Sequence, residues 1–204
     1  MERRRLAVHL PAPPPQAPTT AGECAHPHQG PRQHRRKTRV VDTKTRFGNW
    51  EMDTIIGKDS KGAIVTLVER TTKKLLMARS PRGKNAKAVA KLVVQLLKPF
   101  ERHVRTITTD NGTEFAEHKY IAKMLHTKVF FAHPYSSWEK GLVENTNKLI
   151  RQYIPNGTDF SSVSDDYILH VQTELNLRHR KLLNFSSPKQ KFLLSLHNSV
   201  ALRG

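Results

Sequence analysis

From residue 47 onward, short runs of apolar and β-branched residues alternate with segments whose apolar positions recur at helical spacing. Tight connections at 58–62 and 71–73 join the first three β-rich runs and predict an antiparallel meander. Apolar positions three or four residues apart predict amphipathic helices between the later strands. The predicted strands are 50–57, 63–70, 74–80, 104–109 and 128–132, and the predicted helices are 85–98, 115–125 and 141–154.

This order, β-β-β-α-β-α-β-α, predicts an α/β, ribonuclease H-like fold with a mixed central sheet flanked by helices. In that fold two neighbouring strands each carry one acid, and a later helix supplies a third. The sequence has Asp53 within the first predicted strand, Asp110 at the end of the fourth and Glu144 on the last predicted helix. Three carboxylates on separate elements suit a site that holds two divalent cations around a phosphate, because hard cations prefer oxygen ligands.

Each acid also has an ordinary structural explanation. Asp110 precedes Asn111 and Gly112, and aspartate often begins such a turn. Asp53 lies in an apolar strand, where a buried carboxylate is costly unless a cation or a basic side chain satisfies it, so a structural ion pair is the alternative. For Glu144, the alternative to a metal ligand is an ordinary solvated glutamate that pairs with a lysine on its own helix.

Residues 1–46 differ in composition from the rest of the chain. They are rich in Pro, His, Gln and Arg and show no helical or strand periodicity, so we expect a disordered basic segment. Such a segment suits nonspecific phosphate contacts. We expect residues 47–200 to form the catalytic domain that carries the three acids. Cys24, the single cysteine, cannot complete a His-His-Cys-Cys zinc module or a disulfide, and it fits a reducing cytoplasm.

The charge balance points to a polyanionic partner. The chain carries 35 Lys and Arg against 17 Asp and Glu, a formal net charge of +18. That excess is typical of proteins that bind nucleic acid, although a solvated basic surface or a ribosomal-type binder is the alternative. No run of 18 apolar residues occurs, so we expect no membrane span.

Several ordered blocks have the form of a known family. They are RFGNWEMDTIIG (46–57), GAIVTLVER (62–70), TITTDNGTEF (106–115), PYSSWEKG (134–141), ENTN (144–147) and RQY (151–153). With these blocks, most of 38–195 resembles the bacterial insertion-sequence-30 transposases, which belong to the DDE type within the retroviral integrase superfamily. The spacing from Asp110 to Glu144 also resembles the integrase pattern.

The resemblance implies an integrase catalytic core in which Asp53, Asp110 and Glu144 bind two Mg²⁺ ions, with Mn²⁺ as a substitute. It implies hydrolysis at the end of an insertion sequence, followed by strand transfer at the same site. The implied partner is double-stranded DNA, both transposon ends and target. A homo-oligomer on DNA and a cytoplasmic, nucleoid-associated location are further expectations.

Other residues have supporting roles in this interpretation. Asn111 and Asn147 are candidates to orient the acids or a phosphate, and Glu114 suits a helix start better than a fourth ligand. The candidates for backbone phosphate contacts are Lys140, Lys148 and Arg151, and those for stacking on an unpaired base are Tyr135 and Trp138. For the two aromatic residues, packing beneath a loop is the alternative.

Three functional hypotheses follow. The first is a DDE transposase catalytic domain that cleaves and joins DNA in a metal-dependent reaction. The second is an inactive DNA-binding remnant of a truncated transposase, which would bind DNA without turnover. The third is a structure-selective nuclease on the same fold, which would cut without joining ends.

Overall fold

The computed structural model describes residues 46–60, 62–132 and 140–201, and all of them belong to one unit, His34–Gly204. The predicted basic segment lies outside the described residues except for Arg46. No helix in the described ranges is long and apolar enough to cross a membrane.

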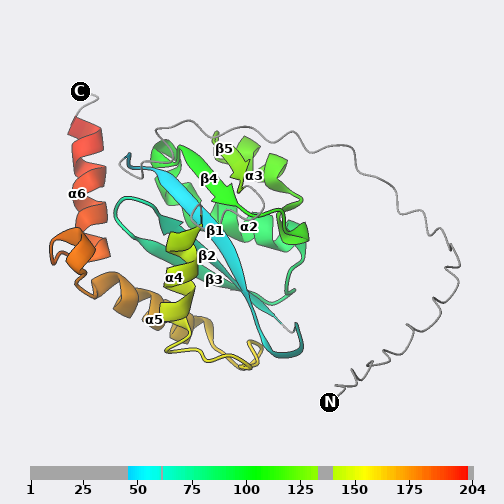
Figure 1. The fold of residues 1–204 in the computed structure, drawn as a ribbon. Coiled ribbons are helices and arrows are strands. Elements are labelled where there is room, and N and C mark those ends of the chain that lie inside the picture. The colour runs from blue at the N-terminus through cyan, green and yellow to red at the C-terminus, as the bar shows by residue number, and fades with distance from the viewer. Residues whose placement is uncertain (1–45, 61, 133–139, 202–204) are drawn as a thin grey trace, which may run out of the picture. The chain divides into compact units, whose positions relative to one another are not determined.

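The described domain is built on a five-stranded sheet with the strand order β3-β2-β1-β4-β5 (Figure 1). The first three strands pair antiparallel, which confirms the predicted meander, and β1, β4 and β5 run parallel. The strands are β1 (Asn49–Ile56), β2 (Ala63–Glu69), β3 (Leu75–Ser80), β4 (Thr106–Thr109) and β5 (Lys128–Phe131).

Alternation along β1 divides its side chains between two hydrophobic cores. Trp50 and Met52 join a core with helices α2 (Ala86–Leu97) and α3 (His118–Met124). Ile55 joins a second core on the opposite face of the sheet. Because side chains two residues apart in a strand share a face, Glu51 and Asp53 belong with Ile55.

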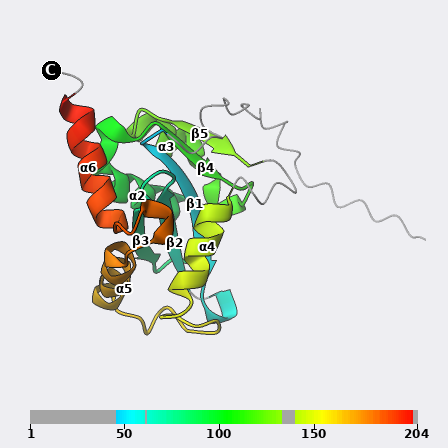
Figure 2. The ribbon, with the colours of Figure 1, turned by 60° about the vertical axis from the view of Figure 1, so that its left-hand side comes forward.

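The second core is covered by α4 (Gly141–Ile150) and α5 (Asp165–Leu177). Figures 1 and 2 show α4 against one face of the sheet and α2 against the other, so the domain has three layers. A last helix, α6 (Pro188–Ala201), is held by Phe192, which packs edge to face on Phe47, Trp50 and Phe100.

The structure corrects two helix predictions. The segment predicted at 115–125 consists of a 3-10 helix, η3 (Thr113–Phe115), followed by α3. The helix predicted at 141–154 ends at Ile150, and i to i+3 bonds then tighten the chain ahead of Pro155, which disfavours helical geometry in the residue before it. The remaining 3-10 helices in the described ranges are η1 (Lys58–Ser60), η2 (Lys98–His103) and η5 (Lys181–Leu183), and like α5 and α6 they were not predicted.

Candidate active site

The sheet brings the two predicted aspartates to the same level. In the parallel pairing of β1 with β4, Glu51 lies opposite Thr108. Asp53 is two residues after Glu51 and lies within β1, and Asp110 is two residues after Thr108 and directly follows β4. The prediction that neighbouring strands carry these two acids is therefore consistent with the register.

Lys140 joins the two aspartates. Its Nζ lies 3.1 Å from Oδ1 of Asp53 and 2.9 Å from Oδ2 of Asp110. The lysine side chain is only 8% exposed, whereas those of Asp53 and Asp110 are 20% and 50% exposed. A side chain predicted to contact a DNA phosphate therefore forms the internal counter-ion of two carboxylates.

Burial decides how these groups hold their protons. Burial raises the pKa of Asp53 above its usual range, and the Lys140 ammonium opposes that shift without cancelling it. For Lys140, burial lowers the pKa, but the two carboxylates outweigh it and the net shift is upward. The lysine is therefore held as a cation between the acids.

A second contact fixes the other carboxylate oxygen of Asp53. Asn147 Nδ2 donates to Asp53 Oδ2 at 2.9 Å, and Thr66 Oγ1 donates to Asn147 Oδ1 at 3.1 Å. Thr66 lies on β2 directly opposite Asp53. The asparagine that the sequence suggested as an orienting residue thus lies in contact with this acid.

Asp110 is held by the turn that follows it. The Gly112 N–H donates to Asp110 Oδ1 at 3.0 Å, and Oδ2 is left to Lys140. A Cβ added at Gly112 would lie 2.5 Å from an oxygen of Glu114 and 3.0 Å from Asp110 Oδ1, so a side chain there would have to displace the Glu114 carboxylate. Asn111, the other predicted orienting residue, is exposed beside the acid.

Glu144 lies on the first turn of α4 and is exposed. It stands four residues after Lys140 and three before Asn147, spacings that place all three on one helix face. Both flanking residues contact Asp53. No cluster of three His, Cys, Asp or Glu close enough to hold a metal occurs within the described ranges, so the structure does not bring Glu144 together with the two aspartates.

The remaining predicted DNA contacts have different surroundings. Lys148 is exposed on α4. The Arg151 guanidinium donates to the carbonyls of Ile56 at 3.0 Å and Pro155 at 3.1 Å, so it ties the end of α4 to the end of β1. Tyr135 and Trp138 lie outside the described residues.

Glu114 is buried at the start of η3, in the helix-start position that the sequence suggested. Its Oε1 accepts from the Thr54 hydroxyl at 2.8 Å and lies 3.2 Å from Lys84 Nζ. Thr54 follows Asp53, and neighbouring residues of a strand point to opposite faces. Glu114 Oε1 therefore bonds a side chain on the other face of β1 from Asp53, while its Oε2 lies beside Gly112 in the turn that holds Asp110.

Glu51 is a positioning residue that the sequence interpretation missed. It is fully buried, and its Oε2 accepts from the backbone N–H groups of Leu142 at 3.1 Å and Val143 at 3.0 Å. Its Oε1 lies 3.1 Å from Nε of the buried Arg70. A carboxylate at the positive end of a helix stabilises it, so Glu51 holds the start of α4 against the sheet. The available signal was an acid two residues before Asp53 in the same apolar strand.

The two aspartates fit a divalent cation. Both are hard oxygen donors, and both aim an oxygen at the same ammonium, so their geometry already converges on one positive charge. Burial raises the pKa of Asp53 even with the Lys140 ammonium beside it, so further positive charge would favour its ionised form. The third predicted ligand, Glu144, is not part of this convergence.

Comparisons with known proteins agree with this geometry. The integrase core domain family matches residues 44–137. A transposase for insertion sequence element IS4351 from Bacteroides fragilis is 48% identical over 163 residues, covering 79% of this chain and 50% of the relative. The transposase for IS1086 from Cupriavidus metallidurans is 37% identical, covering 78% of this chain and 47% of that one.

The transposase InsI for IS30A from Escherichia coli is 34% identical, covering 76% of this chain and 40% of that protein. The chain thus spans half the length of these relatives or less. The catalytic core domain of BIV integrase matches with a TM-score of 0.60 and 21% identity, covering 75% of this chain and 98% of that structure, which confirms the ribonuclease H-like fold. Residues 44–137 therefore match the integrase core domain family, and about three quarters of the chain is similar to part of insertion-sequence transposases, that of IS30A among them.

Proposed function

We propose that this chain supplies the catalytic domain of an insertion-sequence transposase, which cleaves DNA at the element's ends and joins those ends to a target. The observation that carries the proposal is the pair of aspartates on neighbouring parallel strands, converging on one cation. The relatives named as transposases and the excess of positive charge support it.

Integrase-type domains use divalent metal ions, and we propose two Mg²⁺ ions here, with Mn²⁺ as a substitute. Asp53 and Asp110 would hold them, with Glu144 as the third ligand. Such ions polarise the scissile phosphate and activate the attacking hydroxyl. The position of Glu144 on the same face of α4 as Lys140 and Asn147 supports its assignment.

Lys140 has two partners in this proposal. Without divalent cations its ammonium neutralises Asp53 and Asp110. With divalent cations bound to the aspartates, the Lys140 ammonium would be free to contact a phosphate oxygen of the DNA. Asn147 keeps Asp53 in one orientation throughout, because Thr66 fixes the amide from the other side.

The other residue roles and the partners also remain proposals. Lys148 and Arg151 are proposed to contact phosphates, Tyr135 and Trp138 to stack on an unpaired base, and Asn111 to orient Asp110 or a phosphate. The proposed partner is double-stranded DNA from transposon ends and target. We further propose a homo-oligomer on that DNA and a location at the bacterial nucleoid.

The test is cleavage and strand transfer on labelled oligonucleotides from the flanking ends, with Mg²⁺ or Mn²⁺. We expect metal-dependent products from the native chain and none from its Asp110→Asn variant, which keeps the shape of the side chain and loses its charge. Equal DNA binding with no product from either chain would support the inactive remnant. Cut but unjoined ends would support a nuclease.

A further inference from the structure

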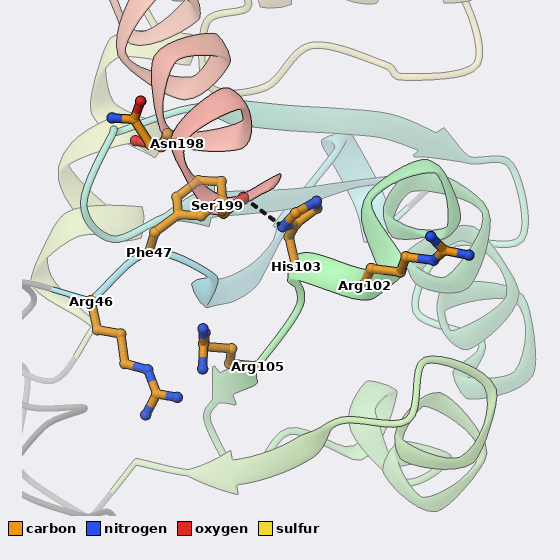
Figure 3. A pocket seen from close by; sticks show the side chains of 8 residues that line it. Arg46, Phe47, Arg102, His103, Arg105, Asn198 and Ser199 are labelled. Atoms are coloured by element: carbon orange, nitrogen blue, oxygen red, sulfur yellow. Dashed lines mark hydrogen bonds between the residues drawn. The ribbon is translucent and has the colours of Figure 1, made fainter. Parts of the chain in front are cut away.

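A basic pocket lies at the opposite end of the sheet from the aspartates. Its volume is about 450 Å³, and it lies where β1 and β4 begin, beside η2 and the second half of α6 (Figure 3). Its lining includes Arg46, Arg102, His103, Arg105, Asn198 and Ser199. All of these side chains carry hydrogen-bond donors, and no acidic side chain is among the described residues that line it.

Few negative charges lie near the arginines of this basic pocket. Arg46 and Arg105 are exposed, and no carboxylate in the described part of the chain lies within ion-pair distance of either. The acid nearest to Arg105 in sequence, Glu101, is paired with Lys98 at 2.6 Å. Two uncompensated guanidinium groups at one pocket favour a ligand with negative charge.

One wall of the pocket is closely packed. The rings of Phe47 and His103 lie 6.1 Å apart, and Ser199 Oγ lies 3.0 Å from His103 Nδ1, as Figure 3 shows. Gly48 has φ +97°, and a Cβ there would lie 2.1 Å from the His103 carbonyl oxygen, so the backbone of β1 and the end of η2 are in direct contact. A preformed site loses less entropy on binding than a loose one.

We propose that this basic pocket binds phosphate groups of a DNA backbone, as a contact separate from the catalytic acids; this rests on DNA being the substrate of the proposed function. Arginine suits that ligand because its planar fork donates two hydrogen bonds to phosphate oxygens. Sugar and phosphate contacts position a duplex without reading its sequence.

The geometry of β1 gives the distance along the DNA. Gly48 and Asp53 are five residues apart in or next to one strand, which is about 16 Å at roughly 3.3 Å per residue. The phosphates of one DNA strand advance about 3.4 Å per step along the helix axis. The pocket would therefore contact a phosphate about five steps from the cut on the same duplex, or a phosphate of a second duplex.

The experiment measures how DNA affinity depends on salt, using the full chain, a labelled duplex and EDTA so that no turnover occurs. The variants are Arg46→Gln with Arg105→Gln, and a control with equal loss of charge, Lys119→Gln with Lys123→Gln, both exposed on α3. If the arginine variant loses two phosphate contacts, the negative slope of log K against log salt should become shallower by about 1.8. An unchanged slope in the arginine variant, or the same loss in the control, overturns the proposal.

Conservative replacement separates charge from geometry. The variant Arg46→Lys with Arg105→Lys should keep the native salt slope, because charge is retained, and bind more weakly, because the fork is lost. Duplex length then identifies the source of the phosphate. The native chain and the Arg46→Gln, Arg105→Gln variant are compared on duplexes that extend fewer than about five base pairs past the cut position. If their salt slopes become equal, the contacted phosphate is on the same duplex. If the slopes still differ, a second duplex supplies the phosphate.

These outcomes are independent of catalysis. The Asp110→Asn variant should keep the native salt slope while it loses cleavage. A chain that binds DNA with the expected slope but never cuts it contradicts the proposed function and leaves the basic pocket in place. A native chain that does not bind DNA overturns both proposals.

Discussion

Lys140 occupies the point at which Asp53 and Asp110 need a positive charge. The two carboxylates approach one ammonium at 3.1 and 2.9 Å, and burial of Asp53 makes an unpaired charge there costly. The sequence shows why a cation is needed in this strand but not which one supplies it. Lys140 would therefore compete with a divalent cation for the same oxygens.

We expect Lys140→Gln to lower the stability of the metal-free chain by about 1–3 kcal/mol, because a partly buried carboxylate loses its charged donor. We also expect Mg²⁺ to bind roughly tenfold more tightly, about 1.4 kcal/mol, because it no longer displaces an ammonium. The measurements are thermal unfolding in EDTA and a titration of the unfolding midpoint with Mg²⁺.

The matched control is Lys148→Gln, which removes an exposed lysine from α4, the helix that Lys140 precedes. It should change neither the metal-free midpoint nor the response to Mg²⁺. Equal Mg²⁺ responses in Lys140→Gln and the native chain would show that the lysine does not compete for the cation site.

Glu69 is a second buried acid, at the end of β2, and its carboxylate accepts from the N–H groups of Gly48, Thr71 and Thr72 and from the Thr72 hydroxyl. Burial nevertheless raises its pKa above the ordinary value of 4.5. A raised pKa in the folded state contributes stability that is fully present below pH 4.5 and is lost as the pH rises through the raised value.

The Glu69→Gln variant lacks this titration. The free energy of unfolding of the native chain, minus that of the variant, should therefore fall as the pH rises from below 4.5. Urea unfolding of both chains over that range measures the difference. A difference that stays constant or grows with pH would mean that the hydrogen bonds to the carboxylate outweigh its burial.

At the scale of elements, α4 is fixed to the sheet at both ends and in the middle. Glu51 accepts from the N–H groups at its start, Asn147 bonds Asp53, and Arg151 bonds the Ile56 carbonyl after its last turn. The helix that carries Glu144 is thus fixed along the same strand that carries Asp53. Small shifts of α4 are coupled to the geometry of the acids.

We expect Glu51→Gln to destabilise the chain by about 3 kcal/mol, because it removes a buried negative charge 3.1 Å from the Arg70 guanidinium and weakens the anchor of α4. Combined with Arg70→Met, the loss should be smaller than the sum of the two single losses. The free energies come from urea unfolding, with Glu174→Gln, an exposed acid on α5, as the control. Additive losses would mean that the pair does not act as a unit.

The sequence predicted the elements whose pattern is local. The meander, β4 and β5 follow from short apolar runs, and Asp53 and Asp110 follow from an acid inside one run and at the end of another. Helices α5 and α6 were not predicted, because leucines on their exposed faces weaken the helical spacing of apolar positions. Among these are Leu169, which is 57% exposed, and Leu193, which is 55% exposed. The contacts of Glu51 and Lys140 depend on how α4 packs on a strand about 90 residues earlier, which no local pattern encodes.

At the scale of the whole molecule, the two sites proposed to contact DNA lie toward opposite ends of the parallel strands. The site of Asp53 and Asp110 lies toward one end, and the basic pocket with Arg46 and Arg105 lies at the other. A duplex in contact with both would extend along the sheet. The +18 net charge then serves to hold DNA over a long path, and affinity should depend steeply on salt.

The composition of residues 1–46 predicts a further contribution of this kind, because the segment is basic and lacks the periodicity of a packed element. Removing residues 1–45 should leave the thermal midpoint unchanged, since the residues from Phe47 onward already form two hydrophobic cores in the described part of the chain. It should weaken DNA binding and lower the salt slope, because phosphate contacts are lost. Calorimetry and DNA titrations on the two chains measure these effects. A lower midpoint after removal would show that the segment belongs to the folded domain, and an unchanged salt slope would show that its charges do not contact DNA.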